Sequence, residues 1–224
     1  MYWIIFIGIA LASWLVQANL KSKFEKFSKI PVGGGMTGRD VALKMLHDNG
    51  IYDVKVQATS GSLTDHYNPA TKTVNLSDDV YGTCSVAAAA VAAHECGHAV
   101  QHACAYGPLR MRSNLVPVIS FASQWMSWVL LIGMFTLHVF PQIMLFGIIL
   151  FAATTLFSLV TLPVEVDASR RAVRWLQSAG VTSSSNHGAA VSALRSAAYT
   201  YVVAALGSLA TLCYYVMVYL GRRD

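Results

Sequence analysis

The sequence predicts a mainly α-helical membrane protein in which four transmembrane helices carry a small α+β domain on the cytoplasmic side. Of its 224 residues, 55% are apolar and only 12% are charged, whereas soluble domains carry about 25% charged residues. Three windows, residues 1–20, 113–164 and 196–221, contain no Asp, Glu, Lys or Arg. This clustering excludes a soluble monomer, a disordered chain and a nucleic-acid-binding module.

The charge-free windows predict four spans, because about 20 apolar residues cross the roughly 30 Å hydrocarbon core of a bilayer. Residues 1–20 form the first, and the lysines that follow from Lys21 on are typical of a retained anchor rather than a cleaved leader. The second window is too long for one span and divides into residues 115–137 and 143–162. The last window predicts a fourth span over residues 197–220.

The distribution of basic residues predicts the orientation, since Lys and Arg collect on the cytoplasmic side of a membrane. With the N-terminus outside, residues 21–114 and 163–196 are cytoplasmic and contain 10 and 4 basic residues, and only Arg222 and Arg223 lie outside. We therefore expect a multi-pass protein of the cell (inner) membrane. The formal net charge of +5 follows from this topology and requires no nucleic-acid partner.

Turn and cap signals divide the two cytoplasmic segments into short elements. A Gly-rich linker at 31–35 precedes a helix that Thr37 caps and that ends near Asp48. Alternating residues and turn signals predict strands at 52–58, 63–67 and 72–76, and an Ala-rich run predicts a helix over 85–103. In the second segment, Pro163 is expected to begin a helix that Gly180 ends, and residues 189–195 lead into the last span.

The Ala-rich helix contains the motif His94-Glu95-Cys96-Gly97-His98. Its two imidazoles stand at i and i+4 on one helix face, where both can reach one Zn²⁺ at about 2.0–2.1 Å. Glu95 flanks the pair and can contact a zinc-coordinated water without binding the ion. The motif therefore predicts one Zn²⁺ per chain with His94 and His98 as ligands and Glu95 as catalytic base, and the alternative is a pair of structural histidines.

A catalytic zinc needs three protein ligands and one open position, so a third ligand must come from elsewhere. The metzincin spacing fails because Gln101 and Cys104 occupy the positions of its glycine and third histidine. His102 lies about 12 Å along the helix from His94, too far to share the ion, and is expected to have a supporting or structural role. The remaining option is a carboxylate from a second helix.

Only three glutamates are present in the chain, Glu25, Glu95 and Glu165. Glu25 lies in a basic juxtamembrane stretch, where we expect it to be solvated and paired with lysines. Glu165 directly follows the third span, where an unpaired carboxylate would be costly. Elimination therefore favours Glu165 as the third ligand, and the alternative is an ion pair with Arg170 or Arg171.

Six stretches, in order along nearly the whole chain, resemble a known family. The chain is similar to the YugP-type neutral zinc metallopeptidases of bacterial membranes, small relatives of the HtpX and CAAX-prenyl endopeptidases. The resemblance implies a zincin-like domain with His94, His98 and Glu165 as zinc ligands and Glu95 as base. The matching stretches are residues 36–40, 61–69, 74–77, Ala92-Ala-His-Glu-Cys-Gly-His-Ala-Val-Gln101, 163–171 and 197–202.

One position departs from the wider gluzincin pattern, which carries an Asp four residues after the ligand Glu to brace a ligand histidine. Here that position is Ser169, and Asp167 points about 200° away from Glu165 on a helix. Ligand imidazoles usually donate their second N–H to an acceptor. The sequence leaves open which group orients His94 and His98.

Further residues are expected to bind substrate or stabilise charge. The strand segment Thr73, Val74 and Asn75 is the candidate to pair with an extended substrate by β-addition, and an ordinary sheet edge is the alternative. An oxyanion donor is also expected. Its candidates, each with a structural role as the alternative, are His187, Tyr199 and Tyr201.

Together these features predict a membrane-embedded zinc metalloendopeptidase whose site faces the cytoplasm. We expect its substrate to be a membrane-associated polypeptide, with membrane-protein quality control as the setting. A non-proteolytic membrane scaffold with a structural zinc is the first alternative, and a zinc hydrolase acting on a lipid or another amphiphile is the second. The sequence leaves open whether the chain forms a homo-oligomer or joins a membrane partner protein.

Overall fold

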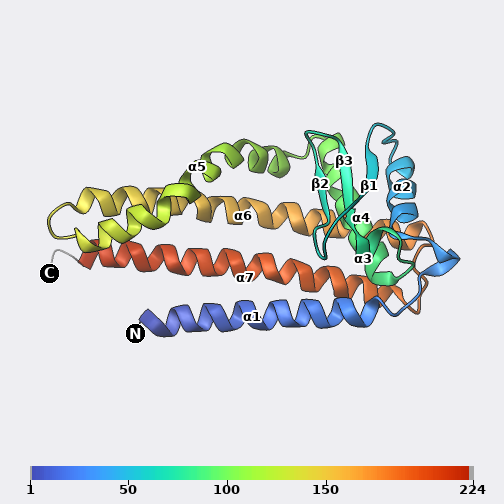
Figure 1. Cartoon of the computed structure of the whole chain (residues 1–224), viewed down its shortest axis with the longest axis horizontal. Helices are drawn as coiled ribbons and strands as arrows, with labels where there is room; N and C mark the ends of the chain where they lie inside the picture. Colours follow the sequence, from blue (N-terminus) through green and yellow to red (C-terminus); the bar gives the residue numbers. More distant parts are fainter. Residues whose placement is uncertain (1, 222–224) are drawn as a thin grey trace.

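Four long helices lie side by side, and a small sheet with three short helices is gathered at one end of them (Figure 1). The computed structural model describes residues 2–221, so Arg222 and Arg223 of the orientation argument lie outside the described residues. α5 packs on α6, α6 on α7 and α7 on α1. The long helices are α1 (Tyr2–Phe27), α5 (Gly107–Phe135), α6 (Pro141–Ser178) and α7 (His187–Leu220).

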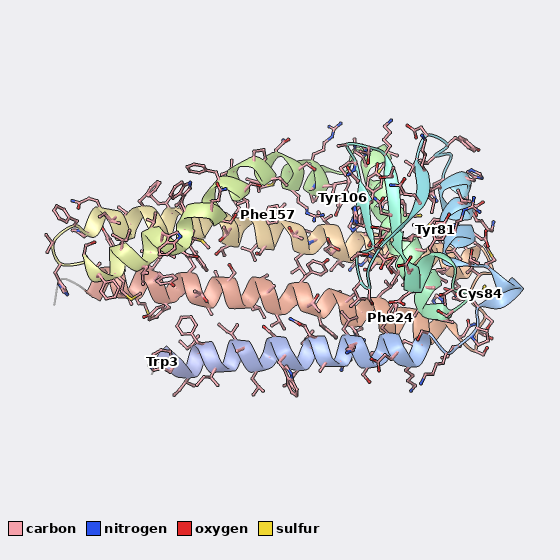
Figure 2. The ribbon with its side chains drawn as sticks, in the orientation of Figure 1. Trp3, Phe24, Tyr81, Cys84, Tyr106 and Phe157 are labelled. Carbon is pink, nitrogen blue, oxygen red and sulfur yellow. The ribbon has the colours of Figure 1, made fainter. Side chains whose placement is uncertain are left out.

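The prediction of four candidate spans is confirmed, because each long helix is long and apolar enough to cross a membrane. The apolar window of α1 has no residue buried inside the protein. Figure 2 shows Trp3 at the end of α1 farthest from the sheet, and its side chain is 79% exposed. Exposing this much apolar surface to water is unfavourable in free energy, whereas contact with lipid chains is not.

The helices α5 and α6 both extend beyond the predicted spans. α5 begins at Gly107 rather than at residue 115, and α6 runs without a break through Pro163 to Ser178. The prediction that Pro163 begins a new helix is wrong. A proline inside a helix removes one hydrogen bond. Here the following turns contain the buried residues Val164 and Ala168, which pack the helix against its neighbours. Glu165 therefore stands on a continuous helix that also forms the third candidate span.

The predicted cap Thr37 is confirmed, and Ser85, where the Ala-rich helix was expected to begin, proves to be a cap as well. In α2 (Gly38–Asp48), Thr37 Oγ1 accepts the N–H of Asp40 at 3.2 Å and the Asp40 carboxylate accepts the N–H of Thr37 at 3.1 Å. In α4 (Val86–Ala103), Ser85 Oγ accepts the N–H of Ala88 at 3.2 Å. These bonds satisfy donors that the first helical turn leaves free. The start of α4, and with it the place of the HExxH motif, is therefore set locally.

The three strands form one sheet, with β3 (Thr73–Ser77) between β1 (Lys55–Thr59) and β2 (His66–Asn68). β1 runs parallel to β3, and β2 runs antiparallel to it. The short α3 (Asp78–Tyr81) and the single turn η1 (Gly33–Gly35) complete the domain.

The prediction that Thr73, Val74 and Asn75 pair with a substrate strand is wrong. These three residues are paired with β1 on one side and with β2 on the other, and their side chains are buried. A substrate strand needs a free edge, and the edge nearest α4 belongs to β2 instead. Length and alternation cannot distinguish a central strand from an edge strand in so small a sheet.

Small residues let α4 approach α6 closely. A Cβ at Gly97 would lie 2.7 Å from the carbonyl oxygen of Ala168 and 3.1 Å from its Cα, which is closer than non-bonded atoms come. Several alanines of α4 are also fully buried, among them Ala90, Ala92 and Ala93. The glycine inside the HExxH motif therefore permits the contact between helices that brings α6 to the two histidines.

Candidate metal centre

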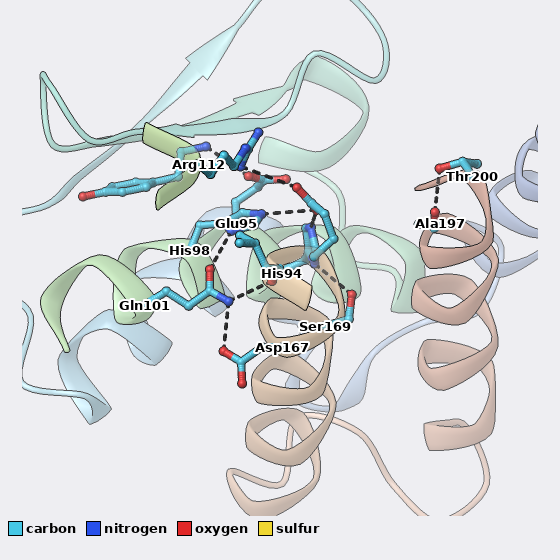
Figure 3. Close-up of polar contacts among 12 residues, drawn as sticks. His94, Glu95, His98, Gln101, Arg112, Asp167, Ser169, Ala197 and Thr200 are labelled. Atoms are coloured by element: carbon cyan, nitrogen blue, oxygen red, sulfur yellow. Dashed lines mark hydrogen bonds and ion pairs between the residues drawn. The ribbon is translucent and has the colours of Figure 1, made fainter. Parts of the chain in front are cut away.

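His94 and His98 of α4 meet Glu165 of α6 at one point (Figure 3). Glu165 Oε2 lies 3.2 Å from His94 Nε2 and 3.5 Å from His98 Nε2. All three potential ligand atoms lie within 4.8 Å of one another. Glu165 and His98 are buried, and His94 is partly buried. Helix periodicity supplies the two imidazoles, and the contact between α4 and α6 supplies the carboxylate.

The distances from Glu165 to the two imidazoles fit a zinc ion. Zinc–ligand bonds of about 2.0–2.1 Å place the corners of a tetrahedron roughly 3.3–3.4 Å apart. The two distances from Glu165 Oε2 lie on either side of that value. Two imidazoles and one carboxylate are a donor set of catalytic zinc sites, in which the fourth position is left for water or substrate.

Cys96 stands inside the motif but is not a fourth donor. Its side chain is fully buried, and its Sγ contacts the carbonyl oxygen of Ala42 in α2 at 3.5 Å. Burial raises the pKa of the Cys96 thiol, so the thiolate that a metal needs is disfavoured. The donor set in the described part of the chain is therefore three residues.

Gln101 determines which nitrogen of His98 faces the cluster. Its side-chain Nε2 donates to the carbonyl oxygen of Val164 at 2.8 Å and to the carboxylate of Asp167 at 2.9 Å. Its Oε1 must then be the acceptor that lies 3.1 Å from His98 Nδ1. His98 consequently keeps a proton on Nδ1, and Nε2 is the nitrogen that can offer a lone pair to a metal once its own proton is lost.

Ser169 and Asp167 provide the orienting groups that the sequence left open. Ser169 Oγ lies 3.1 Å from His94 Nδ1, at the position where the wider pattern has an aspartate. Asp167 does not contact a histidine, but it holds the Gln101 amide and accepts a hydrogen bond from Arg171 Nε at 2.6 Å. The acid therefore acts on His98 through an intervening amide.

The electrostatic environment of His98 has two opposing parts. Burial by itself lowers the pKa of this imidazole, but its hydrogen bond to the Glu165 carboxylate and the charges of Glu95 and Glu165 outweigh burial and raise the pKa above its usual value. In the metal-free protein His98 therefore holds a proton more readily than an ordinary histidine. A metal ion must displace that proton in order to bind.

Glu95 stands beside the cluster and outside the three-residue donor set. Its Oε2 accepts the backbone N–H of Tyr67 in β2 at 3.0 Å, and the side chain is only 8% exposed. The Tyr67 hydroxyl contacts His102 Nδ1 at 2.9 Å. His102 thus braces the strand whose backbone holds Glu95, which agrees with its expected supporting role.

A cavity of about 610 Å³ opens over these residues. β2 and the turn after it form one wall, and α5 and α7 contribute Leu109, Val116 and Tyr201. Arg112 also lines the cavity, with its Nη1 3.6 Å from Glu165 Oε1. Sequence reasoning missed Arg112, although one signal was available, since it is the last charged residue before the second charge-free window.

Only one of the three predicted oxyanion donors reaches this cavity. Tyr201 lines it. Tyr199 instead accepts a hydrogen bond from Arg195 Nε at 2.9 Å and lines a different groove. His187, at the start of α7, contacts Thr182 Oγ1 through its Nδ1 at 2.9 Å. The expectation for Tyr199 and His187 is therefore wrong, because Tyr199 lies on the groove side of α7 and His187 lies about 21 Å along the helix from Tyr201.

Comparison with known proteins decides the family. The profile of the family described as "Putative neutral zinc metallopeptidase" matches residues 2–220. The chain is also 43% identical over 223 residues to a Bacillus subtilis (strain 168) protein named "Putative membrane protease YugP", with 98% of each chain covered. The chain belongs to this zinc metallopeptidase family. No solved structure matches it.

Family membership confirms the resemblance predicted from the sequence and gives the His94, His98 and Glu165 cluster its context. A zinc peptidase family requires a metal centre, and in the described part of the chain this is the one group of three such donors. A peptidase family also implies a polypeptide substrate, and the four apolar helices agree with the name of the membrane relative.

Proposed function

We propose that this protein is a membrane-embedded zinc metalloendopeptidase with the HExxH-plus-Glu donor set and one Zn²⁺ per chain. The observation that carries the proposal is the convergence of His94, His98 and Glu165 beside the buried carboxylate of Glu95. The donors are held by Gln101 and Ser169, so little rearrangement precedes metal binding. The cavity above them has room for a polypeptide segment.

A zinc ion at this site supplies a Lewis acid that lowers the pKa of water to about 7 and polarises a peptide carbonyl. Glu95 accepts the proton of the attacking water as the new C–O bond forms. It then delivers that proton to the amide nitrogen as the C–N bond breaks. The Tyr67 N–H holds one oxygen of Glu95 in place through both proton transfers.

Two further side chains in the cavity are placed to stabilise negative charge. The Tyr201 hydroxyl and the Arg112 guanidinium both line the cavity. Hydrogen-bond donors directed at the carbonyl oxygen stabilise the charge that develops there. We assign Tyr201 this role and assign Arg112 to the neutralisation of Glu165, the acid 3.6 Å from it.

The free edge of β2 is the proposed place for an extended substrate. His66, Tyr67, Pro69 and Ala70 line the cavity along this edge, whereas β3 is enclosed. Val116 and Tyr201 bring two candidate spans to the same cavity. This border position favours substrates that lie in or near the membrane, and the distribution of basic residues supports a cavity that faces the cytoplasm.

The experiment compares the purified full chain with Glu95→Gln, using Glu25→Gln on exposed α1 as the matched control. Zinc is measured by mass spectrometry, and hydrolysis of an unfolded reporter such as casein is followed by product analysis. We expect one zinc in each protein and a roughly 10²–10⁴-fold loss of cleavage in Glu95→Gln alone. A chelator should abolish cleavage by the unchanged protein.

Zinc-dependent cleavage by Glu95→Gln at the unchanged rate would show that the base is misassigned. Zinc binding without hydrolysis of any polypeptide would favour a scaffold with a structural zinc. Release of lipid fragments in place of peptides would favour an amphiphile hydrolase.

A further inference from the structure

A second cavity lies between α6 and α7, away from the metal centre. It is a groove of about 480 Å³ to which both helices contribute. Glu165 and Arg170 are about 140° apart around α6, so the groove opens on a different face of that helix. Ser169 lines the groove and also contacts His94. The floor of the groove is apolar and consists of Val166, Val173, Val191, Leu194, Ala198 and Val202.

Three arginines line the same groove, and all are exposed: Arg170, Arg174 and Arg195. Within residues 2–221 none of them lies within ion-pair distance of a carboxylate. Arg195 packs on Tyr199, with its guanidinium carbon 5.6 Å from the ring centroid. An apolar floor beneath three arginines that form no ion pair is complementary to a ligand with hydrocarbon and an anionic group.

The position of the groove along the helices identifies the source of such a ligand. Arg195 directly precedes the charge-free window of α7, and Val166 lies just beyond the charge-free window that ends in α6. The two helices run in opposite directions (Figure 1). Val166 and Val202 therefore lie at the membrane end of the groove, and Arg174 lies at the end away from it. This is the order of an acyl chain and a phosphate in a leaflet.

We propose that this groove binds one anionic phospholipid from the surrounding leaflet. The phosphate lies among Arg170, Arg174 and Arg195, and an acyl chain runs along the valine floor. Basic pockets between membrane helices bind lipid head groups in this way. The apolar floor favours a lipid over free phosphate, and the border position favours it over an acidic soluble partner. The proposal is independent of the proteolytic function.

The test uses the full chain in neutral detergent, titrated with dioctanoyl-phosphatidylglycerol and followed by calorimetry. The variant Arg170→Gln/Arg174→Gln removes two charges from the groove. Arg39→Gln/Lys55→Gln removes two exposed charges elsewhere and is the matched control. We expect roughly 10- to 30-fold weaker binding in the groove variant, from the contribution of each basic residue to anionic lipid binding, and no change in the control.

A second variant, Ala198→Trp, fills the apolar floor without changing charge and should weaken phosphatidylglycerol binding as well. Dioctanoyl-phosphatidylcholine and inorganic phosphate should bind at least about tenfold more weakly than phosphatidylglycerol, because the choline of the first balances the charge of its phosphate and the second has no acyl chain.

Unchanged phosphatidylglycerol binding in Arg170→Gln/Arg174→Gln would overturn the proposal. Equal binding of phosphatidylcholine would reduce the groove to an ordinary lipid contact, and equal binding of inorganic phosphate would reduce it to an anion site. Light scattering checks the remaining occupant, because loss of a dimer in the groove variant would assign this surface to a second copy of the chain.

Discussion

The two faces of α6 differ in whether their charged side chains form ion pairs within the protein. On the face toward α4, the Glu165 carboxylate lies against His94 and His98, and Arg112 is 3.6 Å from it. On the face toward the groove, Arg170 and Arg174 form no ion pair among the described residues, although the charge of Arg170 still acts on Asp167. Buried charge must be compensated within the fold, whereas charge at the surface is left for something outside. This difference in charge compensation distinguishes the metal centre, whose donors come together on folding, from the groove, where we propose that a lipid binds.

The largest effect that tests this comparison is expected from Glu165→Gln, set against Arg170→Gln on the other face. A neutral amide is a poor zinc ligand, so we expect Glu165→Gln to weaken zinc binding more than the roughly 10–100-fold that loss of a supporting contact costs. Arg170→Gln should bind zinc as the unchanged protein does. Competition with a chromophoric chelator measures both. Equal losses in the two variants would mean that the two faces are not distinct.

A smaller loss is expected when only the support of a ligand is removed. Gln101→Leu deletes the acceptor for His98 Nδ1 and releases Asp167, so we expect roughly 10–100-fold weaker zinc binding. Gln177→Leu, at an exposed position of α6, is the matched control. Zinc affinity that does not change in Gln101→Leu would show that the amide has no part in orienting His98.

The smallest effect is a dependence on pH. Because the pKa of His98 is raised in the metal-free protein, zinc must displace a proton, and its affinity should fall as the pH is lowered. The loss should begin above pH 6.5, the ordinary value for histidine, and reach about tenfold per pH unit for one proton. Zinc titrations between pH 5.5 and 8 measure it.

Metal-free stability should respond to pH in the opposite direction. A folded-state pKa above the unfolded value gives stabilisation that is complete below about pH 6.5 and is lost as the pH rises through the raised pKa. Calorimetric melting of the metal-free chain should therefore show this contribution fading toward alkaline pH. A zinc affinity independent of pH would contradict the protonation assigned to His98.

Much of the architecture could be predicted because it depends on local patterns. The charge-free windows located the four long helices, and Thr37 and Ser85 began α2 and α4 as expected. The helix start predicted at Pro163 was wrong, because buried residues of α6 near the proline outweigh its local helix-breaking effect. The place of β3 could not be predicted because strand order depends on contacts between distant segments.

The sequence alone determined the chemistry available to this protein: four apolar segments that are candidate spans, two imidazoles on one helix face, and a glutamate at the end of the third candidate span. The helix repeat and the length of an apolar segment are local properties, so both can be recognised along the chain. Only the tertiary structure decided how that chemistry is arranged. Gln101 meets Asp167, Ser169 meets His94, and Arg112 meets Glu165 across long sequence separations. The first two of these contacts depend on Gly97, which lets α4 and α6 pack at close range.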